Sequence, residues 1–294
     1  MQFDVIVVGG SYAGMAAALQ VARARRRIMV IDAGLRRNRF AQHSHGFLSR
    51  DGHEPERIAA EAKEQLLAYP DLVWTEGKAE RAEQVDGGFR IGTEAGEIFE
   101  GRRLVLAPGV VDRLPDVPGL AERWGRSVFH CPNCHGYELG GGPLGVLATG
   151  PSAMHQALLI PEWGPTTLFT NGAFSPGDEE LAQLAARGVT VEPVPVDGIA
   201  GHADVHLADG RTIALAGLFT VSATRPASPL AEELGCAYEE GPLGPFIRTD
   251  AMKQTSIPGA FACGDAARAM GTVSLAVGDG ALTGAAVHRS LLFG

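Results

Sequence analysis

The sequence has few cysteines and no long apolar run, and both shortages narrow what the chain can be. Only four of its 294 residues are cysteine, which excludes the dense disulfide framework of a small secreted domain. No stretch is suited to a membrane span, and the chain passes from Met1 directly into an apolar segment without the charged region of a signal peptide. We therefore expect a cytoplasmic protein with no membrane partner.

Basic residues are also in the minority. The chain has 25 Lys and Arg against 34 Asp and Glu, which gives a formal net charge of -9 at pH 7. Nucleic acids bind basic faces, so they are not expected partners. The length favours two domains of ordinary size, and the 39 glycines indicate many close approaches of backbone to backbone.

The first 32 residues have the pattern of one βαβ unit, with a strand over 3–8, a helix over 15–23 and a second strand over 28–32. The turn between them matches the dinucleotide fingerprint except that serine replaces its second glycine. Such a turn brings the backbone close to a pyrophosphate at the positive end of a helix, and an acid after the second strand accepts hydrogen bonds from a ribose. The expected dinucleotide-binding residues are Gly9, Gly10, Ser11, Ala13, Gly14 and Asp32.

Later segments repeat this organisation. A helix is expected over 55–68, short strands with a hairpin turn at 86–88 follow, and a second βαβ pattern covers 144–170. The small-residue helix over 275–292 has no domain of its own. The segment from about Tyr238 onward is therefore expected to return and complete the first domain.

The most specific feature is the run Cys-Pro-Asn-Cys-His-Gly-Tyr-Glu that begins at Cys131. Two cysteines separated by two residues can close a redox-active disulfide, and this spacing tends to lower the pKa of one thiol. Half of a zinc site is the alternative interpretation, as in a sensor whose cysteines switch conformation. No second close pair of ligands supports zinc, because Cys236 and Cys263 are isolated.

Three segments together resemble the FAD-binding set of flavoprotein disulfide reductases. They are the fingerprint at 9–14, Leu-Ala-Pro-Gly at 106–109 and a Gly-Asp pair at 264–265. The resemblance implies FAD contacts from Ala107, Gly109, Gly264 and Asp265, with Asp265 on the ribityl chain. Pro108 departs from the threonine usual in the family, which leaves that contact less well supported.

The position of the cysteine pair resembles that of low-molecular-weight thioredoxin reductases, and the resemblance spans essentially the whole chain. It implies an α/β fold of two Rossmann-like, three-layer ββα domains. The FAD-binding domain would comprise 1–113 and 237–294, and an inserted, degenerate NAD(P)-binding-like domain would comprise 114–236 and carry the disulfide. The resemblance also implies a homodimer, with Cys134 as the thiolate that faces the flavin and Cys131 as the thiol that exchanges with substrate.

His135 stands where the thioredoxin reductases usually have an aspartate proton donor. A histidine there can accept and return protons near neutral pH, and as a cation it would stabilise a thiolate. The run from Cys131 is similar to that of the dithiol oxidases of the gliotoxin and holomycin type, which implies oxidation of a dithiol with dioxygen as acceptor. His43 and His45 are weaker candidates for lining the flavin or substrate pocket.

The second nucleotide site departs from a working one. Ala148 replaces the first glycine of the turn, the second strand ends in Thr-Asn-Gly at 170–172, and residues 127–186 contain no Lys or Arg. NAD(P)H is therefore a doubtful cofactor. The prediction is FAD-dependent oxidation of a dithiol, either a small molecule or a thioredoxin-like protein. The alternative is a thioredoxin or disulfide reductase that is driven by NAD(P)H or ferredoxin.

Overall fold

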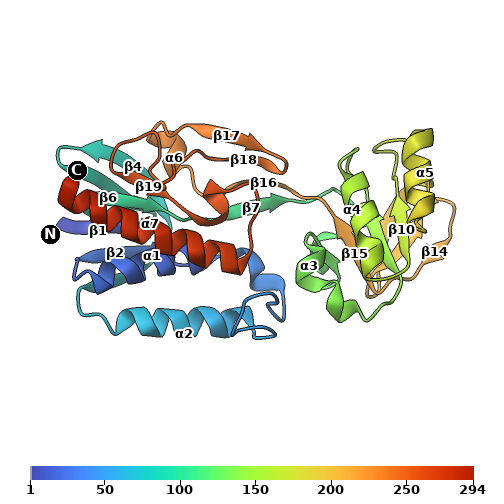
Figure 1. Cartoon of the computed structure of the whole chain (residues 1–294), viewed down its shortest axis with the longest axis horizontal. Coiled ribbons are helices and arrows are strands. Elements are labelled where there is room, and N and C mark those ends of the chain that lie inside the picture. The colour runs from blue at the N-terminus through green and yellow to red at the C-terminus, as the bar shows by residue number, and fades with distance from the viewer. Residues whose placement is uncertain (1) are drawn as a thin grey trace. The chain divides into compact units, whose positions relative to one another are not determined.

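The computed structural model describes residues 2–294, and contacts between residues divide the chain into two compact units (Figure 1). Unit 1 comprises Met1–Arg39, Phe47–Asp112 and Thr224–Gly294, and unit 2 comprises Phe40–Gly46 and Arg113–Ala223. Both units contain a parallel sheet with helices packed on it, so the predicted α/β class is confirmed. No helix within residues 2–294 combines the length and the apolar run that crossing a membrane requires.

These units differ from the expected domain limits in two segments and at Arg113, which belongs to unit 2. Residues 40–46 belong to unit 2, and residues 224–236 belong to unit 1. The second difference has a local cause, because β16 (Ala223–Pro226) pairs with β7 (Val110–Arg113) in a two-stranded ribbon. The identification of the two units as FAD-binding and NAD(P)-binding-like domains stays a prediction.

Unit 1 is built on a sheet with the strand order β3-β2-β1-β6-β5-β4, in which β19 also pairs with the end of β6. Within this sheet the pairings of β4 with β5 and of β5 with β6 are antiparallel, and the other pairings are parallel. Val8 and Ala262 both pair with Leu106, so the carboxyl ends of β1, β6 and β19 meet. The strands are β1 (Gln2–Val8), β2 (Ile28–Asp32), β3 (Leu72–Glu76), β4 (Ala79–Val85), β5 (Gly88–Thr93), β6 (Ile98–Leu106) and β19 (Ala260–Ala262).

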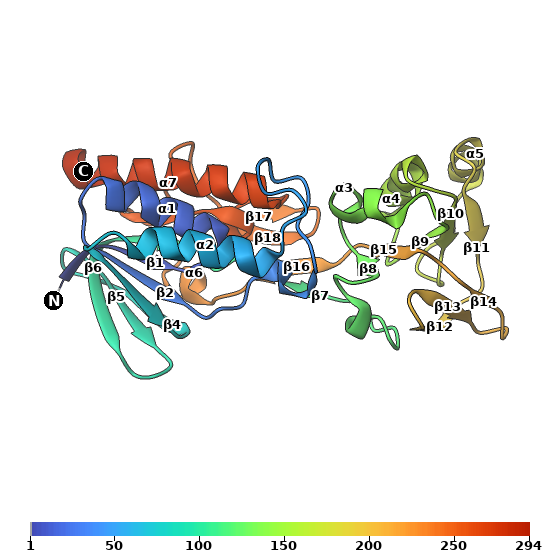
Figure 2. The same ribbon diagram turned by 90° about the horizontal axis from the view of Figure 1, so that it is seen from below.

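Three helices cover one face of this sheet, namely α1 (Tyr12–Arg23), α2 (Pro55–Leu67) and α7 (Val273–Phe293) (Figures 1 and 2). Helix α7 lies very close to α1, because a Cβ atom at Gly280 would collide with the backbone carbonyl of Ala13. A second apolar core lies on the other face of the sheet, and α6 (Leu230–Glu233) packs against it. The hairpin of β17 (Tyr238–Gly241) and β18 (Gly244–Ile247) lies beside α6. Successive strand residues alternate between these two cores, as the pleat requires.

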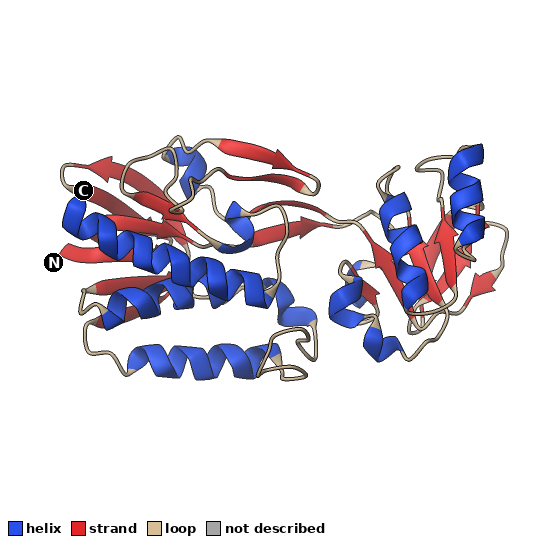
Figure 3. Cartoon of the chain, viewed as in Figure 1, coloured by secondary structure: helices blue, strands red, loops and turns tan. Residues whose placement is uncertain are grey.

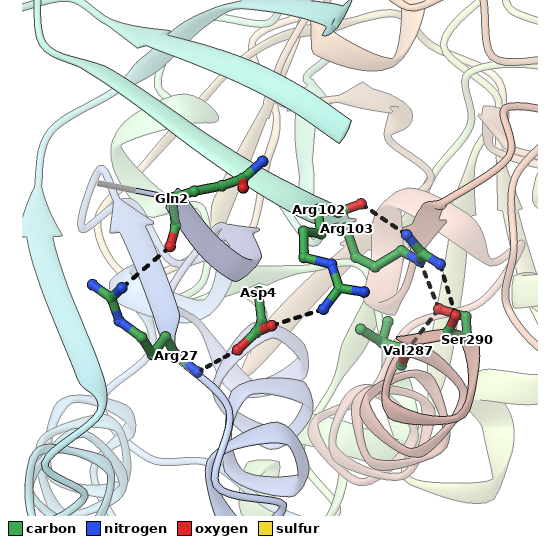
Figure 4. Close-up of polar contacts among 7 residues, drawn as sticks. All are labelled: Gln2, Asp4, Arg27, Arg102, Arg103, Val287 and Ser290. Atoms are coloured by element: carbon green, nitrogen blue, oxygen red, sulfur yellow. Dashed lines mark hydrogen bonds and ion pairs between the residues drawn. The ribbon is translucent and has the colours of Figure 1, made fainter. Parts of the chain in front are cut away.

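Polar contacts tie β1 to Arg27, directly before β2, and to β6, and they tie β6 to α7 (Figure 4). The carboxylate of Asp4 accepts hydrogen bonds from the backbone N–H of Arg27 at 3.0 Å and from the Arg102 guanidinium at 3.2 Å. The neighbouring Arg103 donates to the hydroxyl of Ser290 at 2.9 Å and to its carbonyl at 2.7 Å. These contacts anchor the last turns of α7 to the strand that leads to the Leu-Ala-Pro-Gly segment.

Unit 2 has a five-stranded parallel sheet between two layers (Figure 3). Helices α4 (Ala153–Leu159) and α5 (Asp178–Ala186) belong to one layer, and an antiparallel sheet of β12 (Val196–Ala200), β13 (Asp204–Leu207) and β14 (Thr212–Ile213) forms the other. The expected three-layer ββα arrangement is confirmed. The central strands, in their order, are β11 (Thr190–Glu192), β10 (Thr166–Phe169), β9 (Leu144–Leu147), β15 (Gly217–Thr220) and β8 (Val128–Phe129).

Short helical turns complete the chain, and one of them matters for the site. Helix α3 (Pro132–His135) carries the cysteine motif and continues into the 3-10 turn η3 (Tyr137–Leu139). The remaining 3-10 turns are η1 (Arg37–Phe40), η2 (Ala121–Arg123), η4 (Ile160–Glu162) and η5 (Gly264–Ala267).

Candidate functional site

The glycine fingerprint lies at the carboxyl ends of β1, β6 and β19. Gly9 has a φ of +101°, and a Cβ atom there would collide with the carbonyl oxygen of Ala107. A Cβ atom at Gly14 would in turn collide with the carbonyl of Gly9. The backbone N–H of Gly10 donates to the carboxylate of Asp32 at 3.0 Å, which leaves the second carboxylate oxygen for another donor.

The Gly-Asp pair contacts this fingerprint. A Cβ atom at Gly264 would lie 2.7 Å from that of Ala13, so the two turns pack directly on each other. Gly109, with a φ of +71°, follows shortly after the end of β6. Open α/β sheets bind dinucleotides in a crevice beyond the carboxyl ends of their parallel strands. The glycines at this edge, which have no side chain, fit the close approach of a dinucleotide to the backbone. The expected cofactor residues thus lie along one edge of unit 1: Gly9, Gly10, Ser11, Ala13, Gly14, Asp32, Ala107, Gly109, Gly264 and Asp265.

Arg37 joins two carboxylates at the same edge. Its guanidinium makes two hydrogen bonds to Asp112, at 2.9 and 2.6 Å, and lies 3.3 Å from the carboxylate of Asp265. Burial lowers the pKa of Arg37, but hydrogen bonding and attraction to both acids outweigh burial and raise it. No sequence motif marks this group, because Arg37 and Asp112 are 75 positions apart.

Asp279 of α7 holds the turn that carries Gly264, and sequence reasoning missed it. The Asp279 side chain is 3% exposed, and it accepts the backbone N–H of Gly264 at 2.9 Å. The same carboxylate pairs with Lys253 at 3.0 Å and with Arg268 at 3.1 Å. The available signal was the single acidic residue in α7.

Cys131 and Cys134 form a disulfide at the start of α3, with their Cα atoms 5.3 Å apart. Pro132 occupies the first helical position, where a missing N–H costs no hydrogen bond. A Cβ atom at Gly136 would collide with the Trp163 ring, so glycine lets this end of the helix pack tightly. The motif is therefore a rigid turn within unit 2.

Neighbouring side chains hold both ends of the motif. The buried Gln156 of α4 donates to the carbonyl of His130 at 2.9 Å, directly before the first cysteine. After the second cysteine, the His135 ring stacks on Phe129 with centroids 4.3 Å apart. Burial, followed by repulsion from His45, lowers the pKa of His135 to about 4. With the disulfide closed, His135 is thus neutral at pH 7 and does not supply the expected cation.

A pocket of about 730 Å³ lies within unit 2 beside this motif. His135 and Glu138 line it from the motif, and His43 and His45 line it from the segment 40–46. Nδ1 of His45 lies 3.3 Å from the carboxylate of Glu138. The volume is in the range of small-molecule sites. The two histidines that were weak candidates in the sequence therefore share a pocket with the residue that follows Cys134.

The other two cysteines differ from this pair. Both Cys236 and Cys263 are buried. Burial raises the pKa of Cys263 to about 12 and also raises that of Cys236, so both thiols stay protonated near neutral pH. Within residues 2–294, no group of three or more His, Cys, Asp or Glu is arranged to hold a metal ion.

The second nucleotide-type turn follows β9 in unit 2. It runs through the buried Ala148 to Pro151, a residue that has no N–H to offer a phosphate. At the end of β10, Asn171 has a φ of +49°, and its side-chain oxygen accepts the N–H of Val196 at 2.8 Å. The polar group at this strand end is thus used within the protein.

Arginines near these elements are paired with acids. Arg211 lies 2.7 Å from Glu192 of β11 and 2.7 Å from Asp209. The hydrogen bond from Arg211 lowers the pKa of Glu192. Arg187, after α5, lies 2.6 Å from Glu162. Both arginines are therefore already paired with carboxylates.

The burial of His135 predicts a pH dependence of stability. Its pKa is about 4 in the folded protein against an ordinary value of 6.5, so the unfolded chain binds the proton more tightly. The His135 contribution to stability should be complete above about pH 6.5 and be lost as the pH falls towards 4, by at most about 1.4 kcal/mol per pKa unit. In His135→Gln this part of the slope should disappear. Thermal unfolding of the oxidised protein and the variant from pH 4 to 8 measures it, and identical slopes would contradict the assignment.

Comparison with known proteins agrees with this architecture. The family described as pyridine nucleotide-disulphide oxidoreductase matches residues 3–280. A relative named thioredoxin reductase tcpT, from Claviceps purpurea, is 32% identical over 304 residues, which cover 98% of this chain and 94% of the relative. The crystal structure of an oxidoreductase from Agrobacterium tumefaciens is 57% identical, with a TM-score of 0.97 over 100% of this chain and 99% of the other.

The crystal structure of HlmI is also similar, with 35% identity and a TM-score of 0.92 over 99% of this chain and 93% of that one. The resemblance that the motifs implied is confirmed by a family match and a relative that both extend over nearly the whole chain. The chain belongs to the pyridine nucleotide-disulphide oxidoreductase family and is an enzyme of the thioredoxin reductase-like kind.

Proposed function

We propose that the protein is an FAD-dependent dithiol oxidase that forms a disulfide in its substrate, with dioxygen as the electron acceptor and without NAD(P)H. Membership of the family implies FAD. The arrangement of unit 1 supports FAD as the dinucleotide, because the glycine turn, Asp32 and the Gly264 turn lie at one sheet edge. When bound, FAD supplies the two-electron redox chemistry that links the enzyme dithiol to dioxygen.

The disulfide of unit 2 performs the exchange in this proposal. A substrate thiolate attacks the sulfur of Cys131, the bond between Cys131 and Cys134 breaks, and Cys134 leaves as a thiolate. The second substrate thiol, once deprotonated, attacks the substrate sulfur of the mixed disulfide and releases Cys131. The substrate has then lost two electrons and two protons, and the enzyme cysteines have gained the two electrons.

His135 is the proposed proton carrier for Cys134. The imidazole is neutral while the disulfide is closed, so it has an open site for a proton at the moment when a thiolate forms beside it in the chain. A neighbouring thiolate then favours the protonated ring, which raises the affinity of His135 for that proton. Gln156 and Phe129 hold the segment still during this change, through the His130 carbonyl and the stacked ring respectively.

One observation favours the oxidase over a reductase driven by a nicotinamide cofactor. The arginines around β10 are already paired with acids. Arg187 and Arg211 are each held by carboxylates, and Glu192 adds a negative charge at the end of β11. The phosphates of a nicotinamide dinucleotide would have to rely on backbone amides and a short helix. Such contacts are worth about 0.3 to 1 kcal/mol each at exposed positions.

An anaerobic flavin spectrum tests the direction of electron flow. With separate samples of the purified flavoprotein, we expect dithiothreitol to bleach the flavin within seconds to minutes. NADPH and NADH at about 100 μM should leave it oxidised, because Arg187 and Arg211 near β10 and β11 are already paired with carboxylates. Admission of air to the dithiol-reduced sample should yield one peroxide for each dithiothreitol oxidised and should restore the flavin spectrum once the dithiol is consumed. Rapid bleaching by either nicotinamide would overturn the proposal in favour of a disulfide reductase.

A further inference from the structure

Arg37 lies between two acids at the edge of unit 1 where the glycine turns meet, and no sequence motif accounts for it. The side chains of Arg37, Asp112 and Asp265 are 25%, 10% and 21% exposed, so the group is largely shielded from water. Nε and Nη2 of Arg37 donate to the two oxygens of Asp112, and Nη1 donates to Asp265. The planar guanidinium thereby fixes the directions of both carboxylates.

Asp265 is held at its backbone and at its side chain by different partners. The turn η5 is anchored because the N–H of Gly264 donates to Asp279 at 2.9 Å. The Asp265 carboxylate lies 3.3 Å from the guanidinium of Arg37. It also packs on Gly271, where a Cβ atom would collide with it. Removal of Arg37 would therefore leave the turn in place but give the carboxylate more freedom to rotate.

We propose that Arg37 is a positioning residue for FAD, which holds the Asp265 carboxylate in the orientation that accepts hydrogen bonds from the ribityl hydroxyls. The inference rests on the proposed binding of FAD, in which Asp265 contacts the ribityl chain. A carboxylate has lone pairs for more donors than Arg37 alone supplies, so the ion pair leaves Asp265 able to bind hydroxyls. The loop after β2 would then serve both halves of FAD, with Asp32 for the ribose of adenosine and Arg37 for the ribityl half.

The charges at this edge require a cation. Arg37 carries one positive charge, and Asp112 and Asp265 together carry two negative charges, so the group has a net charge of -1 near pH 7. Without Arg37 the two carboxylates would repel each other. Asp265 would then turn towards water, and a mobile side chain would have to be ordered again each time the ribityl hydroxyls bind, at a cost in side-chain entropy.

A purely structural ion pair is the alternative, and the two halves of FAD distinguish it from a positioning role. ADP contains the adenosine and both phosphates of FAD but lacks the ribityl chain and the isoalloxazine ring. A general defect in unit 1 should weaken both ligands, because Arg37, Asp112, Asp265 and the glycine fingerprint all belong to this unit. A loss of ribityl positioning should weaken FAD and leave ADP almost unchanged.

The test is calorimetric titration of the whole chain, freed of flavin, with FAD and, separately, with ADP. We expect Arg37→Gln to weaken FAD about 30-fold, which is in the usual range for a lost hydrogen bond to a charged group, and to weaken ADP less than about threefold. Arg37→Lys keeps the charge, but its single ammonium cannot reproduce the planar fork, so FAD should still bind about tenfold more weakly. Release of FAD from the flavin-loaded proteins, followed by fluorescence after dilution, should be faster in both variants.

Two variants serve as comparisons. Arg90→Gln is the matched control, because Arg90 also pairs with two acids, Glu83 at 2.6 Å and Glu100 at 2.8 Å. Glu100 pairs with Gln2 at the start of β1, at the opposite end of this strand from the fingerprint. Arg90→Gln should therefore change the affinity for either ligand less than about twofold. Asp32→Ala removes the acid of the adenosine side and should weaken FAD and ADP by similar factors.

Equal losses of FAD and ADP affinity in Arg37→Gln would overturn the positioning role, and so would unchanged FAD affinity in either Arg37 variant. If Arg37→Gln does not fold, Arg37→Lys decides by the same criterion. Failure of the unchanged chain to carry or bind any FAD would mean that the FAD assignment itself is wrong, which is a different result from a failure of the role of Arg37.

Discussion

Replacement of Cys134 by serine is expected to abolish reduction of the flavin by a dithiol, with a loss of about 10³-fold or more in rate. The closed disulfide joins Cys131 and Cys134, and without the second sulfur no disulfide exists for a substrate thiolate to open. The serine hydroxyl does not ionise near neutral pH and cannot carry the electron pair onward. The measurement is the anaerobic bleaching of the flavin by dithiothreitol, with the flavin content of each protein determined first.

Cys236→Ser is the matched control, because its thiol is buried and burial raises its pKa. It should bleach at the rate of the unchanged protein. Cys134→Ser leaves Cys131 free, so the assigned exchange sulfur should still form a stable mixed disulfide with a small aromatic disulfide, visible as added mass. Cys131→Ser should form it more slowly. Full activity in Cys134→Ser would refute the redox role of the pair, and faster labelling in Cys131→Ser would reverse the assignment of the two sulfurs.

The elements of the fold that follow from local patterns were predicted closely. The strand expected over 28–32 is β2, and the helix expected over 55–68 is α2, which ends one residue earlier. The hairpin expected at 86–88 forms because Val85 pairs with Gly88 and Gly87 adopts a φ of +80°. Periodicity and turn chemistry act within a few residues, so one chain is enough to read them.

The predicted start of α1 was three residues late for a related reason. In a glycine-rich turn, small residues give no hydrophobic pattern that marks where the helix begins. The structure starts α1 at Tyr12, after Ser11, which is extended and whose carbonyl accepts the N–H of Met15 at 2.8 Å. The earlier start brings the first turn of the helix up to Gly10. The turn between β1 and α1 is therefore shorter than the sequence pattern indicated.

Contacts between distant segments account for what the sequence could not predict. The pairing of Arg37 with Asp112 and Asp265, and of His45 with Glu138, depends on how sheets bring loops together. The charge state of His135 is a further case, since its residue type suggests a base that titrates near neutral pH, but burial lowers its pKa to about 4. The sequence motif identifies the side chains that react, but the packing around those side chains determines their protonation states.

Asp279→Asn is expected to lower both the stability of the protein and its affinity for flavin. The variant leaves the amide of Gly264 an oxygen acceptor, but it removes the charge that balances Lys253 and Arg268. Lys253 is 9% exposed, so the loss should resemble the breaking of a buried ion pair, about 3 to 5 kcal/mol in the free energy of unfolding. Lys253 also has a φ of +65°, which is uncommon for a residue other than glycine.

Flavin retention is the second readout of this change, because the Gly264 turn that Asp279 holds packs on the fingerprint at Ala13. After gel filtration at equal loading, Asp279→Asn should keep less than about a third of the flavin that the unchanged protein keeps, a shift of over 0.6 kcal/mol at equal total concentrations. Glu80→Gln, which breaks an exposed contact with Lys78, should change stability by under about 1 kcal/mol and leave flavin content unaltered. Unchanged flavin content in a destabilised Asp279→Asn would confine Asp279 to a structural role, since the turn would then hold the cofactor without its carboxylate.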